Sequence, residues 1–81
     1  MKVRVKFFAI LRERAGTAAV TKELVDGSTV ADLWRELQKD HAKLDVAGIR
    51  LLYAVNQNYV SLDHVLKDQD EVVFIPPVSG G

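Results

Sequence analysis

The 81-residue sequence contains no cysteine. The chain therefore has no disulfide bond, no thiolate metal ligand and no cysteine nucleophile. Its formal net charge is zero, with 11 Lys and Arg against 11 Asp and Glu. Nonspecific binding to nucleic acid or to an anionic membrane needs a basic surplus. The composition thus predicts that neither nucleic acid nor a membrane is a partner.

Long hydrophobic runs are also missing. The most apolar stretch near the N-terminus, Phe7 to Leu11, is closed by Arg12-Glu13-Arg14. A secretory signal needs roughly 7–15 apolar residues and a membrane-spanning helix about 20. We therefore expect a cytoplasmic protein.

The length and composition are typical of one small globular domain. Domains run from roughly 50 to 250 residues, so 81 residues leave room for one. The hydrophobic fraction of 48% and the charged fraction of 27% are ordinary for a folded chain. We predict a domain over residues 1–75 and a flexible C-terminal arm over residues 76–81.

The first predicted element is a strand over residues 2–7. Val3, Val5 and Phe7 alternate with lysine and arginine, so the apolar residues share one face. The same alternation places Phe8 on the charged face. Either Phe8 is exposed there, or the strand ends near it and a helix covers it.

One amphipathic helix is predicted over residues 30–41. Thr29 and Asp32 fit a capping box at its start, and Trp34 lies on its apolar stripe, where we interpret it as a core residue. The remaining predicted elements are a turn at 13–17, a strand within 18–25, strands at 51–55, 59–61 and 71–75, and turns at 56–58 and 67–70. Pro76-Pro77 ends the last strand, because proline cannot donate to a strand ladder.

This order of elements predicts an α+β domain with a mixed sheet and one main helix across one face. The first and last strands can then lie side by side and parallel. If Val72 and Phe74 face the helix, Val73 and Ile75 point to the opposite face. Together with Phe8 they would form an exposed apolar patch suited to a partner.

Conventional catalytic groupings are absent from the sequence. Ser61, Asp63 and His64 are too close in sequence to form a hydrolytic triad, and the two histidines lack the spacing of metal ligands. Asp68, Asp70 and Glu71 lack the glycine-centred loop of a calcium site. We interpret these three as solvated turn carboxylates, and we predict no metal site.

The C-terminus is the remaining candidate for chemistry. After Pro76-Pro77, four residues can reach roughly 13 Å when extended. Gly80 and Gly81 carry no side chain, so the backbone can enter a channel too narrow for a Cβ. The terminal carboxylate, with an ordinary pKa of about 3.3–3.7, is ionised at neutral pH. Such an arm would let the active site of another protein hold the carboxylate.

Over nearly its whole length the chain resembles the small subunit of molybdopterin synthase, a ubiquitin-like β-grasp sulfur carrier. The matching segments are Val5-Lys6-Phe7-Phe8-Ala9, Leu11-Arg12-Glu13, Gly16, Ala54-Val55-Asn56-Gln57, Asp70-Glu71-Val72 and Phe74 to Gly81. The Pro-Pro-Val-Ser-Gly-Gly ending is the specific part. One departure is Gln69, where the family usually has glycine, and it bears only on the geometry of that turn.

The resemblance implies a two-stage cycle. An E1-like activating enzyme adenylates the Gly81 carboxylate with ATP, and the acyl adenylate becomes a thiocarboxylate. The arm then enters the large subunit of the synthase and gives its sulfur to cyclic pyranopterin monophosphate, in molybdenum cofactor biosynthesis. The chain itself would be a non-catalytic, sulfur-donating subunit with no permanently bound cofactor. The catalytic side chains would belong to its partners.

The resemblance also implies which residues act. Gly81, with Gly80 before it, would carry the reacting group. The residues implied to contact the partners are Phe8, Arg12, Tyr59, Val73, Ile75, Pro76, Pro77, Val78 and Ser79.

Three alternative functions are also compatible with the sequence. A ubiquitin-like modifier would be joined through Gly81 to lysines of other proteins, and conjugates in cells would reveal it. A sulfur carrier for thiazole or transfer-RNA thiolation would use the same terminus, although the 30–41 helix and the full ending favour molybdopterin. A passive interaction module would keep its activity without Gly80 and Gly81.

Overall fold

The computed structural model describes residues 1–45 and 50–76. Its elements are β1 (Lys2–Phe7), α1 (Ile10–Ala15), β2 (Ala19–Glu23), α2 (Val30–Asp40), η1 (Ala42–Leu44), β3 (Leu52–Val55), β4 (Asn58–Val60) and β5 (Glu71–Ile75). The predicted strands and the main helix are confirmed to within one or two residues. No helix in these two ranges is long and apolar enough to cross a membrane.

The predicted turn at 13–17 was wrong over its first half, because α1 continues through Ala15. The helix has six residues and buries one of them, Leu11, which is too little for a period to show in the sequence. It ends at Gly16, whose left-handed φ of 77° lets its N–H donate to the carbonyl of Arg12.

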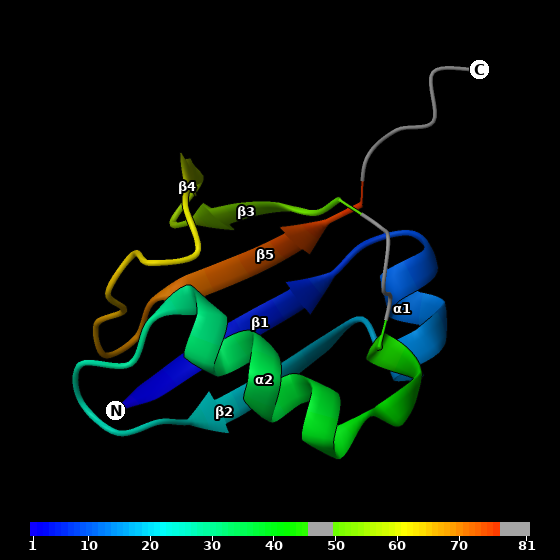
Figure 1. The fold of residues 1–81 in the computed structure, drawn as a ribbon, viewed down its shortest axis with the longest axis horizontal. Helices are drawn as coiled ribbons and strands as arrows, with labels where there is room; N and C mark the ends of the chain where they lie inside the picture. The colour runs from blue at the N-terminus through cyan, green and yellow to red at the C-terminus, as the bar shows by residue number, and fades with distance from the viewer. Residues whose placement is uncertain (46–49, 77–81) are drawn as a thin grey trace.

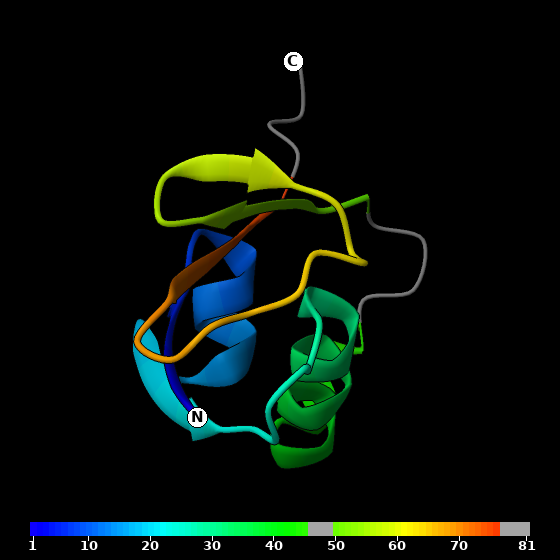
Figure 2. The same cartoon turned by 90° about the vertical axis from the view of Figure 1, so that its left-hand side faces the viewer.

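The five strands form one sheet in the order β2-β1-β5-β3-β4. β1 and β5 pair in parallel, as predicted, and the other neighbours are antiparallel. α2 crosses one face of the sheet, and α1 lies on the same side (Figures 1 and 2). The last strand, β5, is therefore the central strand of the sheet, with β1 and β3 beside it. The face away from α2 carries neither α1 nor α2 (Figures 1 and 2).

The core lies between α2 and the sheet. It contains the apolar residues of β1 and β5 that face the helix, together with the apolar stripe of α2. Its fully buried members are Val3, Val5, Phe7, Leu11, Val30, Leu33, Leu37, Leu44, Val72 and Phe74. The ring of Trp34 lies 4.7 Å from that of Phe74, centroid to centroid, which confirms Trp34 as a core residue.

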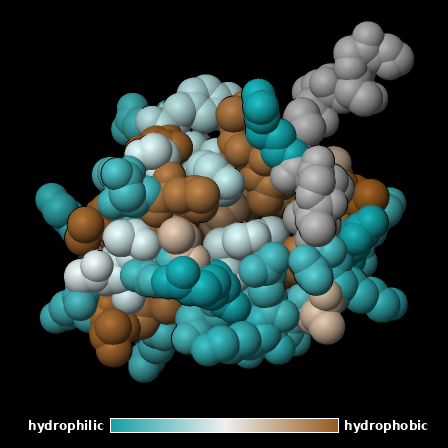
Figure 3. All heavy atoms as spheres, in the orientation of Figure 1, coloured by the Kyte–Doolittle hydropathy of each residue, from teal (hydrophilic) through white to brown (hydrophobic). Residues whose placement is uncertain are grey.

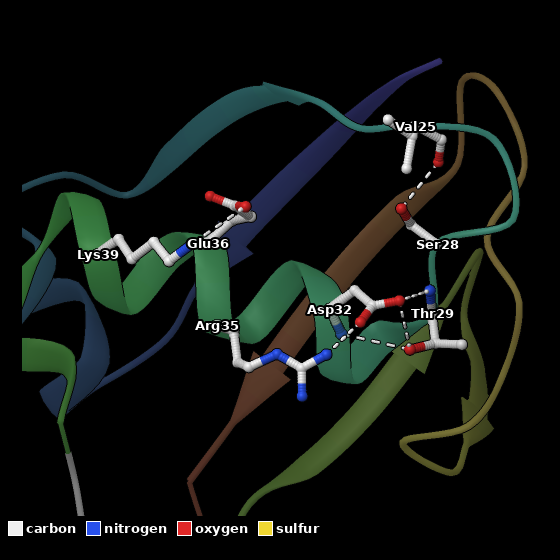
Figure 4. Close-up of polar contacts among 7 residues, drawn as sticks. All are labelled: Val25, Ser28, Thr29, Asp32, Arg35, Glu36 and Lys39. Carbon is white, nitrogen blue, oxygen red and sulfur yellow. Dashed lines mark hydrogen bonds and ion pairs between the residues drawn. The ribbon is translucent and has the colours of Figure 1, made fainter.

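Two sets of contacts fix the start of α2. The predicted capping box is present: the Asp32 amide donates to the Thr29 hydroxyl, and the Asp32 carboxylate accepts from the Thr29 amide (Figure 4). These bonds to Thr29, with a smaller effect of Arg35, hold the pKa of Asp32 below its ordinary value. The chain after β4 supplies carbonyls to the next two amides, His64 to Val30 and Leu62 to Ala31. The N-terminal amides are therefore satisfied from two directions.

The interpretation of Asp68, Asp70 and Glu71 as solvated turn carboxylates was wrong for Asp70. This residue is 8% exposed, and its carboxylate accepts from the Asn56 side chain and the Lys67 amide, each at 2.8 Å. Asn56 is bonded in turn to Glu71, whose amide donates to the Asn56 side chain at 3.0 Å. Asp68 accepts from the Lys2 amide at 2.8 Å, and this bond holds its pKa below the ordinary value. The turns before β4 and β5 are thus tied together at the start of β5.

Gln69 has a left-handed backbone, with φ of 71°. Its amide donates to the carbonyl of Lys2 at 2.7 Å, so the turn is held against β1. A residue with a Cβ is strained in this conformation and glycine is not. The glycine that the family usually has at this position is explained by that geometry.

We predict that Gln69→Gly raises the free energy of unfolding. Relief of the left-handed strain exceeds the added entropy of the unfolded chain by about 0.5–1 kcal/mol. Urea denaturation measures the change. The same substitution at Gln38, inside α2, is the control and should destabilise. An unchanged or lower stability for Gln69→Gly would contradict the strain argument.

We also predict that Asp70→Ala lowers the free energy of unfolding by about 1–3 kcal/mol, because two donors lose their acceptor in a buried site. Asp63→Ala is the matched control, since Asp63 is exposed and its side chain accepts only from the Ser61 hydroxyl among the described residues. Urea denaturation compares the two. Equal stabilities would show that the Asp70 network does not hold the start of β5.

Candidate functional site

The candidate site is the end of the sheet from which the C-terminal arm leaves. β5 ends at Ile75, between the end of β1 and the start of β3, and the half-buried Pro76 follows it. Pro76 thus ends the strand as predicted. The other predicted arm residues, Pro77, Val78, Ser79, Gly80 and Gly81, lie outside the described residues.

The face of the sheet away from α2 carries an apolar patch. Val73 is opposite Ala54, which is opposite Tyr59, so the three side chains form one row across β5, β3 and β4. Ile75 is opposite Leu52 in the next row toward the arm. Tyr59 is 73% exposed, whereas Val73 and Ile75 are half-buried. The predicted outward direction of Val73 and Ile75 is confirmed.

Phe8 is exposed beside this patch. β1 ends at Phe7, opposite Phe74, so Phe8 stands level with Ile75 in the sheet order. The strand does end here, and α1 begins at Ile10, but the helix does not cover Phe8, which is 47% exposed. Of the two possibilities for Phe8, exposure is the observed one. We call Phe8, Leu52, Tyr59, Val73 and Ile75 the docking patch.

Leu52 is the member of the docking patch whose exposure was not predicted from the sequence. It is 47% exposed and lies on the outward side of β3, opposite Ile75. The sequence did contain evidence for this exposure. Residues 51–55 are apolar on both faces of the strand, while the one predicted main helix can cover only one face. Leu52 and Tyr59 also line a hollow of about 380 Å³ at the β3–β4 edge, with Leu51, Tyr53, Val60, Ser61 and Leu62.

The surface on the α2 side has a different character. Figure 3 shows hydrophilic residues across the outward side of α2, with apolar residues gathered above it, over β3 and β5. On the face shown in Figure 3, the apolar residues over β3 and β5 contrast with the polar surface of α2. An exposed apolar area is typical of a partner-binding surface.

Charged residues lie beside the docking patch on the side of β1. Lys6 is opposite Val73, and its ammonium lies 3.5 Å from the Glu71 carboxylate. Arg12, predicted to contact a partner, is exposed on α1. Lys6 and Glu71 therefore offset each other, and Arg12 adds a positive charge beyond the end of β1.

The geometry of the described residues bears on two groupings that could carry chemistry: a metal-binding cluster and the set Ser61, Asp63 and His64. Within residues 1–45 and 50–76, no group of three or more His, Asp or Glu side chains is placed to hold a metal ion. The Ser61 hydroxyl donates to Asp63 rather than to an imidazole. What this arrangement can do is present the end of a chain and dock a partner beside it.

Comparisons with known proteins agree with this picture. The sequence matches the ThiS family over residues 5–81. It is 47% identical to the molybdopterin synthase sulfur carrier subunit of Escherichia coli, over 98% of this chain and 99% of that protein.

Two solved structures place the fold. SAMP1, a small archaeal modifier protein from Haloferax volcanii, superposes with a TM-score of 0.90 at 27% identity, over 100% of both chains. The complex of subunits 1 and 2 of molybdopterin-converting factor from Helicobacter pylori contains a chain that superposes with a TM-score of 0.69 at 25% identity, again over 100% of both. The ubiquitin-like β-grasp fold is thereby confirmed. This chain belongs to the ThiS family, and the resemblance to molybdopterin synthase sulfur carrier subunits is confirmed over its full length.

Proposed function

We propose that this protein is the sulfur carrier subunit of a molybdopterin synthase and acts in the cytoplasm. The observation that carries the proposal is the full-length similarity to a carrier of that name, 47% identical, with the Pro-Pro-Val-Ser-Gly-Gly ending intact after β5. The docking patch beside the arm supports it, since a carrier must be held by a partner while its terminus reacts.

The proposed chemistry takes place at the Gly81 carboxylate. A carboxylate is a poor electrophile, so an E1-like activating enzyme joins it to the AMP part of ATP and releases pyrophosphate. A sulfur donor then displaces AMP and leaves a thiocarboxylate. Like a thiolate, the ionised thiocarboxylate is a nucleophile at neutral pH. It would transfer its sulfur to cyclic pyranopterin monophosphate in the large subunit.

In this proposal the fold positions the arm, and the partners catalyse the activation and the sulfur transfer. The chain needs no bound cofactor, and ATP is consumed by the activating enzyme. Gly80 and Gly81 pass through a narrow channel, while Pro76, Pro77, Val78 and Ser79 span the distance from the sheet. Phe8, Arg12, Tyr59, Val73 and Ile75 contact the large subunit, as does Leu52. The assembly in the Helicobacter pylori complex supports a large-subunit partner.

We predict that Gly81 gains sulfur. The protein is incubated with the activating enzyme of the molybdenum cofactor pathway, ATP and a sulfur donor, and its intact mass is measured. Replacement of one oxygen by sulfur at the C-terminus is expected. A variant lacking Gly81 should fold normally and gain no sulfur. An unchanged mass for the full chain would contradict the sulfur-carrier function.

We predict that Tyr59→Asp weakens binding to the large subunit by at least tenfold, or about 1.4 kcal/mol, because a charge replaces the most exposed ring of the docking patch. Val25→Asp is the matched control. Val25 is 79% exposed, and it lies beyond the end of β2, outside the docking patch. Calorimetry measures both affinities. Equal affinities for the two variants would exclude this face as the binding surface.

A second function is favoured by one observation, the TM-score of 0.90 with SAMP1. A protein modifier would use the same adenylated Gly81 and pass it to a lysine of another protein. Affinity purification of the tagged chain from its own cells, followed by mass spectrometry, distinguishes the two. Isopeptide-linked conjugates would support the modifier function, and thiocarboxylate alone would support the carrier.

A further inference from the structure

Two arginines flank the point where the arm leaves the sheet. β5 lies between β1 and β3, so the chain just after β1 and the chain just before β3 stand on its two sides (Figure 1). Arg12 belongs to α1, which follows β1, and Arg50 lies two residues before Leu52, the first residue of β3. Both side chains belong to exposed residues.

Arg50 lies just before the start of β3. It is exposed, as is Leu52, whereas Leu51 between them is buried. Leu52 is opposite Ile75, the last residue of β5. Because β3 and β5 are antiparallel, the chain before Leu52, which includes Arg50, lies on the side of this pair from which the arm leaves.

Neither arginine is offset by a carboxylate in the described ranges 1–45 and 50–76. The ion pairs found there involve the N-terminus, Lys6, Lys22, Arg35 and Lys39. Glu13 follows Arg12 on α1, but successive helix residues point about 100° apart. On β1, the charge of Lys6 is offset by Glu71. Arg12 and Arg50 are thus two cations on either side of the exit that no carboxylate offsets in those ranges.

This charge constrains the partner. A site that receives the arm must stabilise a terminal carboxylate, and a buried anion needs cations or hydrogen-bond donors around it. A cationic channel would repel two arginines at its mouth. The repulsion is avoided if the channel is cationic in its interior and acidic at its rim.

We propose that Arg12 and Arg50 dock against acidic side chains at the rim of the large-subunit channel that receives the arm, and that they orient the carrier during association. This inference rests on the proposed function. The two cations lie on opposite sides of the exit, so a partner with acidic groups on both sides would align the arm with the channel. Exposed rim charges act mainly on the association rate and on specificity, and contribute less to affinity.

The test is the association rate of the full chain with the purified large subunit of molybdopterin synthase, by stopped flow. Arg12→Glu and Arg50→Glu are compared with Lys67→Glu, which makes the same charge change at the opposite end of β5. Rates are measured at about 0.01 M salt, where charges act over about 30 Å, and at about 1 M, where they act over about 3 Å. Thermal unfolding establishes that each variant is folded.

At low salt, each arginine variant should associate roughly tenfold more slowly than the wild type, while Lys67→Glu stays near it. At high salt the differences should disappear. Arg12→Gln and Arg50→Gln, which remove one charge each, should show a smaller effect in the same direction and serve if a Glu variant fails to fold.

Two other results overturn the inference in distinguishable ways. If the wild type binds the large subunit and the arginine variants associate as fast as Lys67→Glu, the cationic flank has no role in docking, while the proposed function stands. If the wild type does not bind the large subunit at either salt concentration, the proposed function fails, and this inference fails with it.

Discussion

The parallel pairing of β1 and β5 is the constraint on which the rest of the molecule depends. Two parallel neighbours cannot be joined by a tight turn, so the chain between them must cross over the sheet. That crossover carries α2, which covers one face, and both helices lie on that side (Figure 2). The opposite face is therefore left to the docking patch. The last strand ends between β1 and β3, and the arm begins from the interior of the sheet rather than from a free edge.

The polar contacts at the start of β5 act at the other end of the same strand. Asp70 joins the Asn56 side chain to the Lys67 amide, and the Arg4 amide donates to the carbonyl of Asp70. These bonds fix where β5 begins relative to β1 and β3. With both neighbours in register, the position of Ile75 is fixed as well. A buried polar network distant from the terminus thus determines where the arm starts.

Features that depend on neighbouring residues were predictable from the sequence, and features that depend on long-range register were not. The alternation of β1 and the capping box of Thr29 and Asp32 involve residues two or three apart, and both are confirmed. The exposure of Leu52 depends on its pairing with Ile75, 23 positions later, and the burial of Asp70 depends on Asn56. Pairings between residues so far apart in the chain leave no periodic pattern in the sequence. The terminal residues carry the strongest sequence motif, although the described structure does not include them.

The fold itself does not select between sulfur transfer and protein modification, because SAMP1 and the synthase subunit share it. Both activities would begin with adenylation of the same terminal carboxylate. The choice must then be made by the partner that the chain admits, and hence by the surface around the exit. Without a cysteine, the chain has no internal thiol to compete for an activated acyl group. Under the proposed function the reactive atom is confined to the chain end, and selectivity would depend on the docking patch and on the two arginines near the exit.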